Sequence, residues 1–130
     1  MEVSIVPSML QNMLIVDDDD AFLQFVSTMV KTRYPFFEIQ VAFDGEQALA
    51  IDAKDKPPAV VITDIAMPRL DGNCLCNALR ERHGKHVKII AITGTSLSAD
   101  ADFDRILSKP FSMDALFATI DAMLAIPRDD

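Results

Sequence analysis

Five side chains that could do chemistry stand at or just after the ends of short apolar runs in this 130-residue sequence: Asp17, Asp18, Asp64, Thr93 and Lys109. For any single acidic residue, a helix cap or a solvated loop charge is the more common role. Three carboxylates that converged would repel each other and raise each other's pKa unless a cation lay among them. The set therefore predicts a metal site, provided that the fold brings these residues together.

The ligand types indicate which metal and which chemistry such a site would support. Oxygen ligands alone, with no histidine or cysteine pair beside them in the sequence, favour a hard cation. Mg²⁺ suits a site that keeps several waters beside a phosphate. A carboxylate can attack phosphorus and form an aspartyl phosphate once cations neutralise both charged groups. We expect Mg²⁺ and Lys109 to supply that neutralisation.

The elements that would position these residues follow from the hydrophobic pattern. Runs rich in Val and Ile without polar alternation predict buried strands at 13–16, 59–63 and 87–93, and weaker strand signals lie at 37–43 and 105–108. Apolar residues at helical spacing lie between the strands and after the last one, at Phe22, Val26, Met29 and Val30, at Ala48, Leu49 and Ile51, at Leu75 and Leu79, and at Leu116, Phe117, Ile120 and Leu124.

Helix-start and helix-stop residues support the same alternation. Asp44-Gly45, Asp71-Gly72 and Ser112 stand where helices should begin, and Gly84 stands where the third should end. Asp19 and Asp20 are expected to cap the first helix. Alternating strands and helices predict an α/β fold, a doubly wound parallel sheet with helices on both faces. Ligands bind such sheets beyond the carboxyl ends of the strands, where the five side chains are expected.

Composition narrows the possible partners. The formal net charge is −8, and acidic residues concentrate at 17–20 and 100–104. Such a chain disfavours a nucleic-acid backbone and favours metal ions and basic surfaces. No apolar run approaches the roughly 20 residues that span a bilayer, and the start of the sequence lacks the basic region of a signal peptide. We expect a single cytoplasmic domain that binds neither nucleic acid nor membrane, with Cys74 and Cys76 as half-buried helix residues.

Several sequence blocks together resemble the response-regulator receiver domains of two-component signalling. The matching blocks are Leu14-Ile15-Val16-Asp17-Asp18-Asp19, Val61-Ile62-Thr63-Asp64-Ile65-Ala66-Met67-Pro68, Asp71-Gly72, the Thr93-Gly94 pair and Lys109-Pro110-Phe111. Each block is weak alone, but their order is jointly specific. The resemblance covers about residues 12–126, with 1–11 as an N-terminal extension and 127–130 as a C-terminal tail.

The resemblance implies a flavodoxin-like five-stranded sheet of order 2-1-3-4-5 and a role for each site residue. Asp64 would be the phospho-acceptor, with Asp17 and Asp18 as acidic Mg²⁺ ligands. The backbone carbonyl of Ala66 would be a further ligand. Lys109 would pair with a phosphoryl oxygen, and Thr93 would move toward it after phosphorylation. The implied partners are a histidine kinase or histidine phosphotransfer protein and an unidentified downstream protein.

Two features depart from the receiver pattern. Ile106 stands where the family commonly has an aromatic residue in the fifth strand. Only the residues 94–105 connect the fourth and fifth strands, close to the minimum of about 10 to 12 for a crossover that contains a helix. This connection is polar and offers little amphipathic stripe. We expect the fourth helix to be short or missing and the segment to be irregular and mobile.

Two other functions fit part of the pattern. A haloacid-dehalogenase-like phosphatase would use Asp17 as its nucleophile, but it leaves the block from Asp64 to Gly72 unexplained. A pseudo-receiver would act as a phosphorylation-independent adaptor, as Ile106 and the short crossover suggest. The intact Asp64, Thr93 and Lys109 count against that second alternative.

Overall fold

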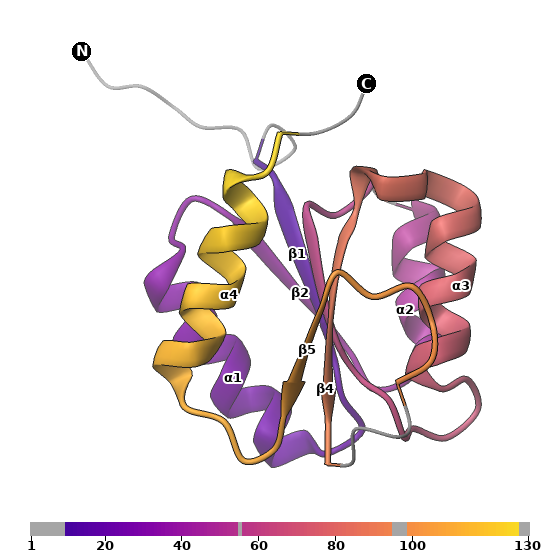
Figure 1. Cartoon of the computed structure of the whole chain (residues 1–130), viewed down its shortest axis with the longest axis horizontal. Helices are drawn as coiled ribbons and strands as arrows, with labels where there is room; N and C mark the ends of the chain where they lie inside the picture. The colour runs from indigo at the N-terminus through magenta and orange to yellow at the C-terminus, as the bar shows by residue number, and fades with distance from the viewer. Residues whose placement is uncertain (1–9, 55, 95–98, 128–130) are drawn as a thin grey trace.

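The computed structural model describes residues 10–54, 56–94 and 99–127, and these form a central sheet with helices on both sides (Figure 1). In chain order the elements are β1 (Asn12–Val16), α1 (Asp20–Arg33), β2 (Glu38–Ala42), α2 (Gly45–Lys54), β3 (Val60–Asp64), α3 (Gly72–His83), a 3-10 turn (Gly84–His86), β4 (Lys88–Thr93), β5 (Arg105–Ser108) and α4 (Met113–Ala125).

The five strands are parallel and lie in the order β2-β1-β3-β4-β5, which confirms the predicted topology. In the register, Val16 lies beside Thr63 and Thr93 lies beside Ser108. The carboxyl ends of the strands therefore meet at one edge of the sheet, so residues that directly follow different strands come together.

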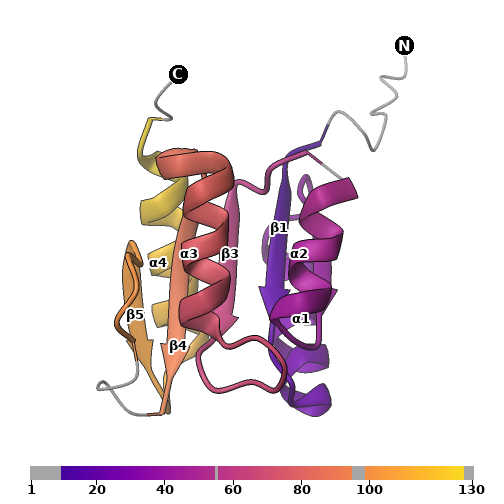
Figure 2. The ribbon, with the colours of Figure 1, turned by 90° about the vertical axis from the view of Figure 1, so that its right-hand side faces the viewer.

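The helices cover the two faces in pairs, as the edge-on view shows (Figure 2). On one face the buried residues of α1 and α4, such as Val26 and Ile120, pack against Met13 and Ile15 of β1. On the other face α2 and α3 pack against the alternate β1 residues, Leu14 and Val16. This alternation explains why the central strands are apolar without interruption: both of their faces are buried.

The predicted helix starts have the expected side-chain caps, including Asp44, whose carboxylate accepts from the Gln47 N–H at the start of α2. The carboxylates of Asp19 and Asp71 and the hydroxyl of Ser112 accept hydrogen bonds from the main chain of the first turns of α1, α3 and α4. Such a cap satisfies a main-chain donor that has no partner inside the helix. Gly84 ends α3 with a φ of 60°, the left-handed backbone that favours glycine. The helix boundaries thus follow from local sequence signals.

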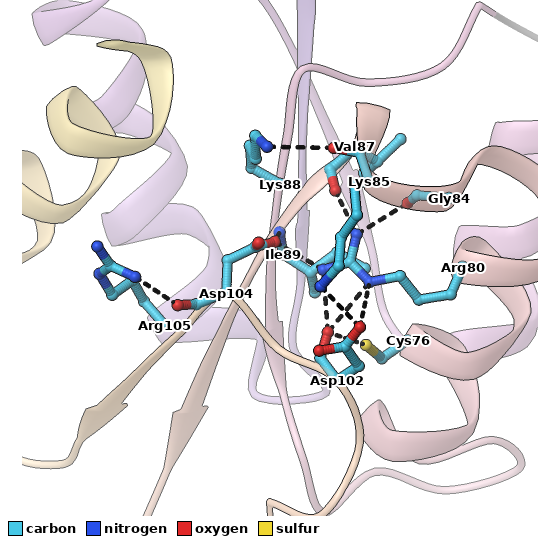
Figure 3. A network of polar contacts seen from close by, with 10 residues as sticks. All are labelled: Cys76, Arg80, Gly84, Lys85, Val87, Lys88, Ile89, Asp102, Asp104 and Arg105. Carbon is cyan, nitrogen blue, oxygen red and sulfur yellow. Dashed lines mark hydrogen bonds and ion pairs between the residues drawn. The ribbon is translucent and has the colours of Figure 1, made fainter. Parts of the chain in front are cut away.

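The crossover from β4 to β5 contains no helix in its described residues, 99–104, as the short connection predicted. Residues 95–98 of the same segment lie outside the described residues. The guanidinium of Arg80 on α3 holds the segment: it donates to the Asp102 carbonyl at 2.9 Å and to the Asp104 carboxylate at 2.6 Å (Figure 3). Asp104 in turn accepts from the Ile89 main chain. This part of the crossover is therefore anchored to α3 and β4.

The two cysteines differ from their predicted half-buried state. Both lie on α3, where Cys76 is fully buried in the core and Cys74 is exposed. Their opposite environments follow from helix geometry, which points residues two apart to opposite sides. Within the described residues, no helix has the length and apolar character needed to cross a membrane.

Candidate functional site

The predicted site residues come together at the carboxyl edge of the sheet. Asp17 and Asp18 directly follow β1, Asp64 is the last residue of β3, Thr93 is the last of β4, and Lys109 directly follows β5. Because β1, β3 and β4 are adjacent in the sheet, their ends place the three aspartates and Thr93 side by side. Residues up to 92 positions apart in sequence thus share one site through strand pairing alone.

The three carboxylates form a cluster that could hold a cation. Asp17, Asp18 and Asp64 each offer an oxygen, and these oxygens lie within 4.8 Å of one another. Asp17 is buried, Asp64 is half-buried and Asp18 is exposed, so the cluster opens to solvent on one side. The Oδ2 atom of Asp17 is buried and has no hydrogen-bond partner. A buried anionic oxygen without a partner is costly, and a metal ion is one group that would satisfy it.

Burial and mutual repulsion perturb the two inner carboxylates. Loss of solvent raises the pKa of Asp17, although the main-chain N–H of Asp19 and the Lys109 ammonium oppose the shift. Burial and the charge of Asp17 raise the pKa of Asp64. Both carboxyl groups are therefore less readily ionised than ordinary ones without a metal. Raised pKa values of neighbouring carboxyl groups are expected at a site where a bound cation would stabilise the ionised forms.

Among the described residues, Lys109 is the cation that pairs with the cluster. Its Nζ atom lies 3.6 Å from Oδ2 of Asp17 and 3.9 Å from Oδ2 of Asp64. The same nitrogen lies 4.6 Å from the centroid of the Phe22 ring on α1, a cation–π contact. The Lys109 main-chain N–H donates to the carbonyl of Thr93, and the bond to Pro110 is cis. Strand pairing and α1 together fix the ammonium above the site.

Thr93 is almost fully buried beside the cluster, with 2% of its surface exposed. Its place at the end of β4 agrees with the predicted location. The proposed movement of its hydroxyl toward a phosphoryl group stays a prediction, as does the metal-ligand role of the Ala66 carbonyl. Ala66 lies two residues beyond Asp64, in the exposed loop that borders the site.

The loop from β3 to α3 is held against the site by two glycines. A Cβ atom on Gly72 would lie 2.2 Å from the carbonyl oxygen of Asp64, and one on Gly45 would lie 2.5 Å from that of Leu70. The Gly72 N–H donates to the carbonyl of Ile65. Only glycine permits these close approaches, which explains the Asp-Gly pair after the third strand in terms of packing.

An ion pair fixes the middle of the same loop. Arg69 has a φ of 68°, uncommon for arginine, and its guanidinium lies 2.7 Å from Oδ2 of Asp44. The carboxylate of Asp44 also accepts from the Gln47 N–H, and this bond together with Arg69 lowers the pKa of Asp44. Neither the ion pair between Arg69 and Asp44 nor the contact between Phe22 and Lys109 was predicted, because no local sequence pattern indicates that these residues are partners.

The donor set fits Mg²⁺. Three carboxylate oxygens at one edge, a buried oxygen that accepts no hydrogen bond and an open solvent side match a hard cation that keeps part of its water shell. Asp17, Asp18 and Asp64 are the side chains that would hold it.

Comparisons with known proteins show the family and the fold of this chain. A family model described as the response regulator receiver domain matches residues 13–121. Response regulator MprA of Mycobacterium avium is 35% identical over 125 residues, which cover 90% of this chain and 53% of that protein. The chain thus spans about half the length of this curated relative.

Solved structures show the same fold. Vibrio cholerae chemotaxis protein CheY4 is 27% identical with a TM-score of 0.75, over 88% of this chain and 98% of that one. The response regulator TrrA of Thermotoga maritima, solved in complex with Mg²⁺–BeF, is 24% identical with a TM-score of 0.76, over 88% of this chain and 99% of that one.

Proposed function

The chain belongs to the response regulator receiver domain family, and from that membership we propose that it is a switch which accepts a phosphoryl group on Asp64. The observation that carries the proposal is the arrangement around Asp64: the oxygens of Asp17 and Asp18 lie within 4.8 Å of its own, and Lys109 Nζ lies 3.9 Å away. Receiver domains are signalling switches, and this geometry has the parts that a phospho-acceptor needs.

The chemistry proceeds by in-line displacement. An oxygen of Asp64 attacks the phosphorus of a phosphohistidine, the new oxygen–phosphorus bond forms, and the nitrogen–phosphorus bond breaks with its electrons returning to the donor imidazole. The Lys109 ammonium neutralises charge on a phosphoryl oxygen as it arrives. Oδ1 of Asp64 accepts a hydrogen bond from the Ile65 N–H at 2.8 Å, which orients the carboxylate for attack.

Mg²⁺ held by Asp17, Asp18, Asp64 and the Ala66 carbonyl would neutralise the repulsion between the carboxylates and the phosphoryl oxygens. The Mg²⁺–BeF complex of TrrA supports this role by analogy within the family. Lys109 already faces Asp17 and Asp64. One positive charge would therefore lie beside the phosphoryl group when it reaches Asp64.

The proposed donor is a histidine kinase or a histidine phosphotransfer protein, and the signal leaves through a separate downstream protein. The net charge of −8 favours basic surfaces as partners. We place the protein in the cytoplasm, where such kinases present their phosphohistidine. The domain assists its own phosphorylation and dephosphorylation, but it turns over no other substrate.

One observation favours a second candidate, the phosphorylation-independent adaptor. Ile106 is 48% exposed on the edge strand β5, where no helix covers it among the described residues. The side chain that commonly reports phosphorylation by rotating is thus replaced by an exposed aliphatic one. An adaptor would keep the fold and the surface but would take up no phosphoryl group.

A labelling experiment separates the candidates. The protein is incubated with acetyl phosphate and Mg²⁺, and a base-labile adduct of about 80 Da, the mass of one phosphoryl group, is located by mass spectrometry. An adduct on Asp64 supports the phospho-acceptor, and an adduct on Asp17 supports a phosphatase-like nucleophile. The absence of any adduct, with the protein folded and Mg²⁺ bound, supports the adaptor.

A further inference from the structure

A polar cavity lies at the opposite edge of the sheet from Asp64. It has a volume of about 220 Å³ and opens between the beginning of β4 and the end of α4. The residues that line it include Gln11, Ala59, His86, Lys88, Met123 and Leu124. The phospho-acceptor chemistry uses none of these residues. Among the described residues, the lining contains a lysine and a histidine and no acidic side chain.

Lys88 gives the cavity its charge. It is the first residue of β4 and only 9% exposed. Its Nζ atom donates to the carbonyl of Lys85 at 3.2 Å, and it forms no ion pair with any carboxylate that the structure describes. An ammonium has three donors, and a buried charge is costly unless it is paired and hydrogen-bonded. The described contacts satisfy one donor, so this side chain has capacity for an anionic partner.

The charged residues that the structure describes near Lys88 do not pair with its ammonium group. The Lys88 ammonium is joined to the Arg80 network only through the carbonyl of Lys85 (Figure 3), and the next residue, Ile89, belongs to the core on the other face of the sheet. Asp102 is bound to the ammonium of Lys85 at 2.7 Å. Asp102 therefore pairs with Lys85 rather than with Lys88.

The carboxyl end of α4 stabilises the positive charge of Lys88 but does not bind it. Its last turn contains no basic residue, so a nearby ammonium offsets the negative end of the helix dipole. However, no hydrogen bond joins Nζ to a described carbonyl of α4. The helix end favours the charge without occupying the two remaining donors.

We propose that this cavity is an oxyanion-binding site in which Lys88 binds a carboxylate or phosphate group. His86 and Gln11 lie at the exposed rim and would supply further hydrogen bonds. Met123 and Leu124 would contact the apolar part of a small organic anion. The oxyanion can come from a free molecule or from Asp129 and Asp130, which follow Pro127 in the sequence.

Titration with inorganic phosphate, without Mg²⁺, tests the site. NMR signals of the Ala59 and Met123 methyl groups and of the His86 ring should shift and saturate in the wild-type protein. In Lys88→Met the affinity should fall about tenfold or more, as expected for the loss of a hydrogen bond to a charged group. Lys88→Arg should retain binding, and Lys31→Met, at an exposed lysine of α1, should bind like the wild type.

The double variant Asp129→Asn with Asp130→Asn distinguishes the two sources. If the carboxylates of the chain itself are the resident ligand, phosphate should bind more tightly to this variant than to the wild type. If the ligand is a free molecule, the affinity should be unchanged. The proposal is overturned if phosphate shifts none of the three signals in either the wild type or the double variant, or if Lys88→Met responds as the wild type does.

Discussion

Lys109 lies closer to Asp17 than to Asp64: its Nζ atom is 3.6 Å from Oδ2 of Asp17 and 3.9 Å from Oδ2 of Asp64. One ammonium thus faces the two carboxylates whose pKa values are raised by burial. In the metal-free protein the Lys109 ammonium partly neutralises the charge of these two carboxylates. Its removal should therefore affect metal binding and phosphoryl acceptance differently.

In Lys109→Met, we expect Mg²⁺ to bind at least as tightly as in the wild type, because the carboxylates lose a competing positive charge. Phosphorylation from acetyl phosphate should slow at least about tenfold, because a charge-assisted contact to the phosphoryl group is lost. Calorimetric Mg²⁺ titration and time-resolved mass spectrometry measure the two effects, with Lys31→Met as the control. A collapse of Mg²⁺ affinity would instead assign Lys109 a structural role.

The raised pKa of Asp17 predicts how metal-free stability changes with pH. Because its pKa in the folded state lies above the ordinary 3.8, the folded protein holds more protons than the unfolded chain in the window between the two values. The free energy of unfolding should therefore fall as pH rises through that window. Asp17→Asn should flatten this slope and be more stable than the wild type at pH 7 without metal.

Urea unfolding from pH 4 to pH 8, with and without Mg²⁺, measures this effect. Saturating Mg²⁺ should stabilise the wild type more than Asp17→Asn, since the ion binds the folded state. Glu81→Gln, at an exposed acid of α3, is the control and should follow the wild type. An equal pH dependence of the wild type and Asp17→Asn in the absence of metal would contradict the assignment.

The Arg80 network predicts a stability effect far from the site. The Arg80 and Asp104 side chains are 12% and 14% exposed, and the guanidinium also donates to the carbonyls of Gly84 and Val87. Arg80→Met should destabilise the protein by about 3 to 5 kcal/mol, because it leaves a largely buried carboxylate without its partner. Arg105→Met removes one exposed hydrogen bond and should cost less than about 0.5 kcal/mol. Equal effects would refute the anchoring role.

The fold and the clustering of the proposed site residues could be predicted from the sequence because both follow from short-range signals. Asp17 and Asp64 stand at the ends of apolar strands, and parallel pairing brings such ends to one edge whatever the details of packing. Arg80 could not be recognised in this way, since an arginine in the last turn of a helix is usually a solvated charge. Its partners Asp102 and Asp104 lie 22 and 24 residues away, and only the folded chain brings them to Arg80. The domain boundaries at 12 and 126 stay predictions.

Phosphorylation should act on the first part of the β4–β5 crossover. A phosphoryl group beside Thr93 and the Gly94 N–H offers new contacts to the 94–105 segment, which we predicted to be irregular and mobile. Amide hydrogen exchange with and without beryllofluoride should show increased protection there. The Asp104 amide should change little, because it already donates to the Ile89 carbonyl at 2.9 Å. Changes confined to α1 or α3 would show that the signal leaves by another face.

The most direct test of the account is phosphoryl transfer to Asp64→Asn, since the amide lacks the nucleophilic oxygen. The wild type, Asp64→Asn and the exposed-site control Asp100→Asn are each incubated with acetyl phosphate and Mg²⁺, and the bound phosphoryl group is measured by intact mass. The account predicts equal labelling of the wild type and the control, and a loss of at least about a hundredfold in Asp64→Asn. Undiminished labelling of Asp64→Asn would contradict it.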